Sequence, residues 1–170
     1  ICGCNNSFQL GEKSNNTDSM KNGIINLPII SCLDTESISS FSSYSDHSVA
    51  IFSNGTIYAA GDNRDRRIIN ILPQEFLTDF TKFEIRGNST LLWHPVSAIC
   101  GNYYTAYLVT VTKESSEHQI IYSFSDCDSR FLDIGNSNLI SLFGGRSNAV
   151  AINDDGSILF ITESIIYSKA

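Results

Sequence analysis

The sequence has few charged residues, only three prolines and no long apolar run. Asp, Glu, Lys and Arg supply 17% of its 170 residues, against roughly 25% in an average soluble domain. Ser and Asn are abundant instead, and because they compete with the backbone for hydrogen bonds, they favour turns and strands over long helices. No apolar run reaches the roughly 20 residues of a transmembrane helix, so no membrane span is expected.

Positive charge is also scarce, since 11 Lys and Arg residues face 18 Asp and Glu residues and leave a formal net charge of −7. Such a surface repels the phosphates of nucleic acids, so we expect no direct nucleic-acid binding. A basic protein partner remains compatible with this charge.

The five cysteines lack the even number and regular spacing of a disulfide framework. We therefore expect buried thiols and an intracellular protein, in the cytoplasm or the nucleus. Secretion is the alternative, because Asn-x-Ser/Thr sites begin at Asn5, Asn15, Asn54 and Asn88.

Motifs of catalysis and cofactor binding are missing from the sequence. It contains no Gly-x-Ser-x-Gly and no Gly-x-x-x-x-Gly-Lys-Ser/Thr, and Cys2-x-Cys4 does not have the spacing of a zinc site. We expect no catalytic residue, no metal and no cofactor, and therefore no enzyme.

Two hairpins are predicted from their turns. Asn54-Gly55 separates the apolar stretches 47–52 and 56–60, and Asp155-Gly156 separates 147–152 and 157–161. Asn-Gly and Asp-Gly favour tight hairpin turns because these residues accept positive φ angles.

A third hairpin is expected between them, with strands at 104–111 and 119–124 joined by a polar loop over 112–118. Tyr58, Tyr122 and Phe160 are expected at equivalent places in the three return strands. A period of about 50 residues indicates stacked units that share their cores. Residues 74–80 are predicted to hold one helical turn, and the single tryptophan, Trp93, to lie in a linker.

The segment 44–63 resembles the repeat of the regulator of chromosome condensation (RCC1) family. That repeat reads roughly as Gly-x-x-His, an apolar strand, a turn with Gly, Val-Tyr-x-Trp-Gly and then x-Asn-x-x-Gly-Gln-Leu-Gly. Residues 1–11 resemble its end and include Gln9-Leu10-Gly11. The other copies are diverged, since Tyr104 and Asn148 stand where the first copy has His47, and the usual Trp is absent.

The resemblance implies an all-β fold, a partial RCC1-like β-propeller of about three antiparallel four-stranded blades belonging to a longer protein. One domain, 1–170, is expected to divide into four units. They are the end of a blade with a linker at 1–31, blades at 32–95 and 96–138, and a partial blade at 139–170.

The resemblance also marks structural repeat positions, which are turn glycines and a few polar or aromatic residues: Gly3, Gln9, Gly11, His47, Gly55, Tyr58, Gly61, Asn63, Gly101, Tyr122, Gly145 and Gly156. His47 is expected to be a buried, hydrogen-bonding histidine that ties adjacent strands together, because buried polar groups are paired.

One segment is predicted to bind a partner, and it replaces the usual Gly-Gln-Leu-Gly turn. Its candidate residues are Arg64, Asp65, Arg66 and Arg67. Guanidinium groups pair bidentately with carboxylates and phosphates. The alternative is a solvated loop with internal Arg–Asp pairs that contribute little.

Function is therefore expected to reside in the loops of a non-catalytic protein-interaction scaffold. By resemblance, its protein partner would be a small GTPase or a ubiquitin-ligase component. The alternative is a guanine-nucleotide exchange factor for a Ran-like small GTPase, although no segment corresponds to the wedge that such an activity requires.

Overall fold

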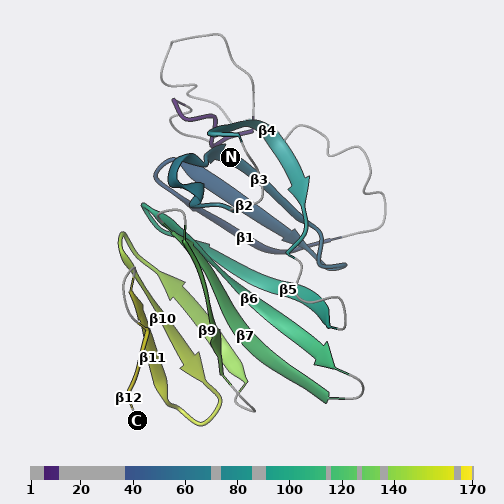
Figure 1. Cartoon of the computed structure of the whole chain (residues 1–170), viewed down its shortest axis with the longest axis vertical. Helices are drawn as coiled ribbons and strands as arrows, with labels where there is room; N and C mark the ends of the chain where they lie inside the picture. Colours follow the sequence, from purple (N-terminus) through teal and green to yellow (C-terminus); the bar gives the residue numbers. More distant parts are fainter. Residues whose placement is uncertain are drawn as a thin grey trace.

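The structure, a computed structural model, describes residues 6–11, 37–69, 74–85, 91–113, 116–125, 128–134, 138–162 and 166–169. Within them the chain forms three antiparallel sheets of four strands each (Figure 1). The predicted all-β class and the four-stranded antiparallel units are confirmed.

Each sheet is a meander in which consecutive strands pair. The first sheet holds β1 (Ile38–Tyr44), β2 (His47–Phe52), β3 (Ile57–Asp62) and β4 (Phe76–Phe83), with a short 3-10 helix, η1 (Arg64–Arg66), between β3 and β4. The second sheet holds β5 (Leu92–Cys100), β6 (Tyr104–Lys113), β7 (Ser116–Ser125) and β8 (Asp128–Asp133). The third sheet holds β9 (Leu139–Gly144), β10 (Asn148–Asn153), β11 (Ile158–Thr162) and β12 (Ile166–Lys169).

The two predicted tight hairpins are confirmed. Gly55 and Gly156 have φ angles of 80° and 81°, a region that glycine occupies without steric cost. The amide oxygen of Asn54 accepts a bond from the Thr56 N–H at 2.9 Å, and the carboxylate of Asp155 accepts one from the Ser157 N–H at 2.8 Å. Local turn chemistry therefore sets both hairpins.

Three local predictions are wrong. The polar loop expected over 112–118 is largely strand, because β6 and β7 stay paired as far as Lys113 and Ser116. The helical turn expected over 74–80 is replaced by β4, whose outer position beside β3 overrides local preference. Trp93 lies in β5 rather than in a linker, and its ring packs edge-on against Tyr122 at 5.7 Å.

The three sheets stack so that their first strands are neighbours: β1 lies against β5, and β5 lies against β9 (Figure 1). Serine side chains of β1 bond the backbone of β5 directly. The Cys100 N–H donates to Ser42 Oγ at 2.9 Å, and the Ala98 N–H donates to Ser40 Oγ at 3.3 Å. Hydroxyl groups thereby join two strands that belong to different sheets.

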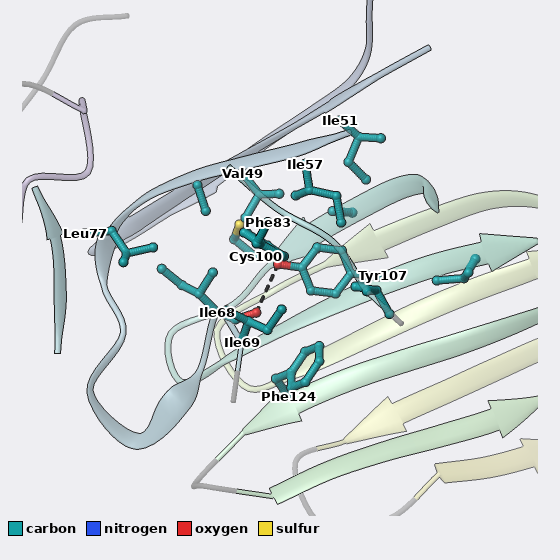
Figure 2. Close-up of a cluster of buried hydrophobic side chains, with 14 of the residues drawn as sticks. Val49, Ile51, Ile57, Ile68, Ile69, Leu77, Phe83, Cys100, Tyr107 and Phe124 are labelled. Carbon is teal, nitrogen blue, oxygen red and sulfur yellow. Dashed lines mark hydrogen bonds between the residues drawn. The ribbon is translucent and has the colours of Figure 1, made fainter. Parts of the chain in front are cut away.

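A continuous apolar core fills the space between the first and second sheets (Figure 2). Val49 and Ile57 of the first sheet face Tyr107 and Phe124 of the second, and all four side chains are buried. Tyr107 donates its hydroxyl to the backbone oxygen of Ile68 at 3.0 Å, a bond drawn in Figure 2. Burial raises the pKa of the Tyr107 hydroxyl well above its usual value, which keeps it a neutral donor.

A second core lies between the second and third sheets. Ala106 and Leu108 of β6 pack there with Ala149 and Ala151 of β10. Because side chains alternate along a strand, β6 sends Tyr107 and Val109 to one core and their neighbours to the other. The middle sheet is therefore covered on both faces.

The predicted equivalence of Phe160 with Tyr58 and Tyr122 is wrong by one residue. Tyr58 pairs with Ala50, Tyr122 pairs with Tyr107, and the residue in that register on β11 is Leu159, which pairs with Ala151. A shift of one residue moves a side chain to the opposite face of a sheet. Leu159 is buried against the second sheet, whereas Phe160 lies on the outer face.

Candidate functional site

The predicted partner-binding residues lie at one end of the sheets, which we call the turn face. It consists of the turns that lead into the second strand of each sheet (45–46, 101–103 and 145–147) and of the turns 6–11 and 63–69. Asp62 N–H donates to the Asp46 oxygen at 2.8 Å, and Asn102 N–H donates to the Arg146 oxygen at 2.7 Å. Backbone bonds thus join the turn 45–46 to the end of β3, and the turn 101–103 to the turn 145–147.

The residue at the His place of the repeat bonds the first sheet to the second and the second sheet to the third. His47 is fully buried, and its Nε2 lies 2.8 Å from the hydroxyl of Thr105 on β6. Tyr104, at the same position of the second sheet, donates its hydroxyl to the Asn148 oxygen on β10 at 2.6 Å. His47 and Tyr104 therefore have the same role in successive repeats. Each makes a hydrogen bond to the next sheet, and not to another strand of its own sheet.

Burial dominates the ionisation of His47. Removal from water, with a further contribution from the positive charge of Arg67, lowers its pKa from 6.5 to about 3, although Asp62 opposes the shift. The imidazole is therefore neutral throughout the physiological range, as suits a structural histidine rather than a proton-transfer group.

The segment 63–69 keeps the geometry of a repeat end despite its different sequence. The Asn63 side-chain oxygen accepts bonds from the backbone N–H groups of Ile68 and Ile69 at 3.1 and 3.2 Å. Arg66 has a φ of 56°, and Phe8, which holds the same place in residues 6–11, has a φ of 63°. Both occupy the position at which the RCC1-like pattern has glycine.

Arg67 stands in the place of the repeat's Gln and makes the equivalent bond. Gln9 Nε2 donates to the oxygen of Ser45, which lies two residues before His47. Arg67 Nη1 donates to the oxygen of Asn102, which lies two residues before Tyr104, at 3.0 Å. Arg67 is only 5% exposed, so its role in the structure is to join the first sheet to the second.

The carboxylates of Asp62 and Asp65 neutralise the charges of Arg67 and Arg64. Asp62 is fully buried and pairs with Arg64 at 2.7 Å and with Arg67 at 3.5 Å, while Asp65 pairs with Arg67 at 3.2 Å. Burial raises the pKa of the Asp62 carboxyl, but the hydrogen bonds from Arg64 and the charge of Arg67 outweigh it, and the net pKa is lowered. Asp62 therefore stays ionised.

The predicted set of four residues thus divides into an inner and an outer part. Arg67 is buried, Asp65 holds it, and Arg64 is half-exposed with its guanidinium over the ring of Phe76 at 5.0 Å. Arg66 is exposed. A bidentate grip on a ligand by all three arginines does not match this arrangement, because Arg64 and Arg67 are already paired.

Two exposed residues that sequence reasoning missed lie on the same face. Tyr103 is 42% exposed, and its ring lies 5.4 Å below the Arg67 guanidinium. Arg146 is exposed in the next turn, whose backbone bonds that of Asn102. Both could have been found in the sequence from their place in the repeat, since each lies in the turn before the second strand of its sheet.

The remaining repeat positions are turn or packing residues. Gly61 has a φ of 110°, and a Cβ there would lie 2.2 Å from the Asp46 oxygen. A Cβ on Gly101 would overlap the ring of Tyr104, and one on Gly11 would overlap that of Phe80. Gly145 bonds the Asn148 oxygen through its N–H at 2.8 Å. Gly3, like the sequon residues Asn5, Asn15 and Asn88, lies outside the described residues.

Groups of three or more His, Cys, Asp or Glu side chains that could hold a metal do not occur within the described residues. Cys100 is buried, and burial raises the pKa of its thiol to about 12, so the thiolate that reacts or binds metal is disfavoured. The other four cysteines lie outside the described residues. No described helix is long and apolar enough to cross a membrane.

Comparison with known proteins agrees with the repeat geometry. The profile of the regulator of chromosome condensation (RCC1) repeat matches residues 38–66, which are β1 to η1. No curated protein sequence matches the chain significantly.

Among solved structures, human WBSCR16 is similar over 99% of this chain, with a TM-score of 0.71 and 12% sequence identity. Yeast RCC1 (Prp20) in its complex with Kap60 is similar over 94% of the chain, with a TM-score of 0.54 and 14% identity. Prp20p from Saccharomyces cerevisiae, a protein with binding properties toward Gsp1p and histones, is similar over 79% of the chain with a TM-score of 0.51 and 12% identity.

The chain spans about half the length of the first two structures, 47% of WBSCR16 and 50% of the RCC1 chain bound to Kap60, and 36% of the third. At this level of identity the likeness concerns the fold, which is that of part of an RCC1-like β-propeller.

Proposed function

Since the chain carries diverged RCC1-like repeats in a partial β-propeller, we propose that it is a non-catalytic protein-interaction scaffold that binds its partner through the turn face. Turns on a rigid sheet scaffold are where such folds place their binding residues. In this proposal residues 1–31 are the end of a blade with a linker, 32–95 and 96–138 are blades and 139–170 is a partial blade. The protein is intracellular.

One observation carries the proposal: the backbone of the turn face is held by buried bonds, whereas several of its large side chains are exposed. Asn63 and Arg67 hold the turn from inside. Arg66, Tyr103 and Arg146 present two guanidinium groups and an aromatic ring outward. Arg and Tyr are enriched at the energetic centres of protein interfaces, because they combine large contact area with directed hydrogen bonds.

The exposed charges of the turn face are mainly positive. Arg64, Arg66 and Arg146 are exposed, with Asp65 among them, on a chain whose net charge is −7. A protein partner with an acidic surface would complement these arginines, and such charge complementarity gives specificity more than affinity.

The test is a triple variant of the full-length protein, R66A/Y103A/R146A, in a quantitative capture assay for a partner identified with the wild type. Loss of two or three contact residues should weaken binding by at least about tenfold, the effect of 1.4 kcal/mol. The control variant K82A/K113A removes the same positive charge from exposed sites elsewhere and should bind normally. Equal affinity of the triple variant and the wild type would exclude this surface.

A second candidate function is guanine-nucleotide exchange on a Ran-like small GTPase. The structurally similar Prp20p has binding properties toward Gsp1p, and this observation supports the alternative. Catalytic amounts of the full-length protein would then accelerate release of labelled GDP from the GTPase. An unchanged release rate, together with capture of a ubiquitin-ligase component, favours the scaffold.

The intracellular assignment has its own test at Asn54. This residue is exposed in the β2–β3 turn, so a glycosylation enzyme would find it accessible. Mass spectrometry of the protein from its natural source should detect Asn54 without a glycan; a glycosylated peptide would establish secretion instead.

A further inference from the structure

The tip of the β2–β3 hairpin places an exposed amide side chain next to a glycine. Asn54 is exposed, whereas Gly55 is buried and has no side chain that would hinder its backbone nitrogen. When that nitrogen attacks the asparagine amide, a succinimide ring closes, and because the reaction is intramolecular its two groups are always close together. Glycine eases the ring closure, since its backbone takes conformations that other residues avoid. The hairpin therefore holds both groups of a self-modification reaction.

The fold also polarises the amide that would be attacked. The Thr56 N–H donates to Asn54 Oδ1 at 2.9 Å. This oxygen gains negative charge when a nucleophile adds to the amide carbon of Asn54, and a backbone N–H aimed at it stabilises that charge. The hydrogen bond that shapes the turn thus also favours attack on the side chain.

An imidazole from the second sheet lies against the same turn. A Cβ on Gly55 would lie 2.8 Å from His94 Nδ1 and 3.4 Å from Pro95 Cδ, so these two residues of β5 pack against the glycine. His94 is exposed. Imidazole is the side chain best suited to accept and return a proton near neutral pH, directly or through one water molecule. The second sheet therefore supplies a proton carrier to the hairpin of the first.

We propose that Asn54 is a deamidation site, at which the Gly55 nitrogen attacks the Asn54 side chain and His94 transfers the proton. The Gly55 N–H first leaves the Phe52 oxygen, to which it donates at 2.8 Å. Its nitrogen then bonds to Asn54 Cγ while its proton passes to the imidazole. The imidazole returns a proton to the departing amide nitrogen, which leaves as ammonia. Water hydrolyses the succinimide at either carbonyl and gives aspartate or isoaspartate.

The third sheet shows that an aspartate product fits this kind of turn. Asp155 precedes Gly156 at the equivalent place, and its carboxylate accepts a bond from the Ser157 N–H at 2.8 Å. Hydrogen bonds from the side chain and the backbone of Ser157 lower the pKa of the Asp155 carboxyl. An ionised carboxylate resists nucleophilic attack, so we expect the third-sheet hairpin to stay unmodified.

An isoaspartate product changes the hairpin more than an aspartate does. It adds a carbon to the backbone of a turn that is closed by the bond from the Gly55 N–H to the Phe52 oxygen. Gly55 would then shift from its contacts with His94 and Pro95. Deamidation therefore loosens a contact between the first two sheets, and it also removes the acceptor amide of the glycosylation site at Asn54.

Peptide mapping by mass spectrometry, during incubation of the full-length protein at neutral pH, tests the proposal. Asn54 should convert to aspartate and isoaspartate at least about tenfold faster than Asn102 and Asn148, whose next residues carry side chains. The variant N54Q, whose longer side chain closes a larger ring, should stay intact. Conversion of Asn54 no faster than that of Asn102 would overturn the proposal.

The variant H94Q tests the role of the imidazole. The dipeptide Asn22-Gly23, which lies outside the described residues, provides an internal reference with the same local sequence. H94Q should slow the conversion of Asn54 at least about tenfold and leave that of Asn22 unchanged, because general acid–base catalysis contributes this much or more. H118Q removes an imidazole from β7 instead and should match the wild type. An unchanged rate at Asn54 in H94Q, or an equal slowing at Asn22, would overturn the proposal.

Urea separates the effect of the fold from that of the sequence. In the unfolded protein the second sheet no longer brings His94 to the turn, so the wild type and H94Q should convert Asn54 at equal rates. A difference that persists in urea would contradict the role of the folded contact. Melting temperatures of the two proteins within about 2 °C of each other verify that H94Q keeps the fold. None of these outcomes depends on binding at the turn face, because the hairpin lies at the opposite end of β2.

Discussion

The role assigned to Arg67 changes once its contacts are known. In the sequence it is one of three arginines in the segment 64–67 of an acidic chain. In the structure it bonds Asn102 of the next sheet and pairs with Asp62 and Asp65. Its neighbour Arg66 has no such role, and its φ of 56° costs energy that glycine would not. Of these two adjacent arginines, Arg67 therefore stabilises the structure, whereas Arg66 is exposed on its surface.

Replacing Arg66 with glycine should stabilise the protein by about 0.5–1 kcal/mol, because relief of the left-handed conformation exceeds the entropy that glycine adds to the unfolded chain. Urea unfolding at neutral pH measures the change. R66A is the control, since it removes the same charge and keeps the Cβ. If R66G were no more stable than R66A, the strain at this position would be negligible.

His47 should make stability depend on pH below neutrality. Its pKa is about 3 in the folded state and 6.5 when unfolded, so the unfolded state binds the extra proton between these values. The contribution of His47 is fully present above pH 6.5 and is lost at roughly 1.4 kcal/mol per pH unit as the pH falls toward 3.

The variant H47Q isolates this effect, because glutamine keeps a hydrogen-bonding group near Thr105 and does not titrate. Chemical unfolding from pH 7 to pH 4.5 should show a shallower decline for H47Q than for the wild type. Parallel curves for the two proteins would show that His47 is solvated in the folded state.

The turns and hairpins follow local rules, but their tolerance to change depends on what lies beside them. Gly61 and Gly156 both have positive φ angles, yet a Cβ on Gly61 would strike the Asp46 backbone, whereas one on Gly156 would meet no atom within 4 Å. The same substitution should therefore have different costs in the two elements.

We expect G61A to destabilise the protein by about 2–4 kcal/mol, through strain and steric overlap with the backbone. G156A should cost about 1 kcal/mol, from the backbone conformation alone. Thermal or urea unfolding of both variants compares them directly. Similar losses at both sites would show that the Asp46 turn shifts to accommodate the new methyl group.

Arg67 connects two elements, and glutamine should replace it in part. R67A removes the bond to Asn102 and leaves Asp62 with Arg64 as its described ion-pair partner, so we expect a loss of about 2–3 kcal/mol. R67Q places at position 67 the same side chain that bonds the Ser45 oxygen from Gln9. Glutamine should therefore bond Asn102 in the same way and recover part of the lost stability in the same unfolding assay. Equal losses for both variants would mean that the charge, and not the bond to Asn102, is what matters.

Over the whole chain, stability is expected to decrease from the first sheet to the third. Every residue of β2 is buried, whereas β10 alternates buried and partly exposed residues, although both are central strands. Hydrogen exchange on the 170-residue chain should show amides of β10 exchanging at least about tenfold faster than those of β2. Equal protection would indicate a single cooperative unit.

The hairpins, the repeat period and the β class were readable from the sequence because they depend on neighbours a few residues apart. Asn54-Gly55 and Asp155-Gly156 are sufficient to set two of them. The RCC1-like pattern was likewise carried by short stretches, and the matching profile covers residues 38–66 of the same region. The boundaries of the repeats stay predictions.

Contacts between sheets could not be read in this way. His47 and Thr105 are 58 positions apart, Arg67 and Asn102 are 35 apart, and each bond depends on how two sheets stack. The error at Phe160 has the same origin, since neighbouring residues on a strand look alike in sequence and face opposite sides of a sheet. Local chemistry thus determines the strands and turns of this protein, whereas packing over long separations determines which arginines are buried and which side chains remain exposed to meet a partner.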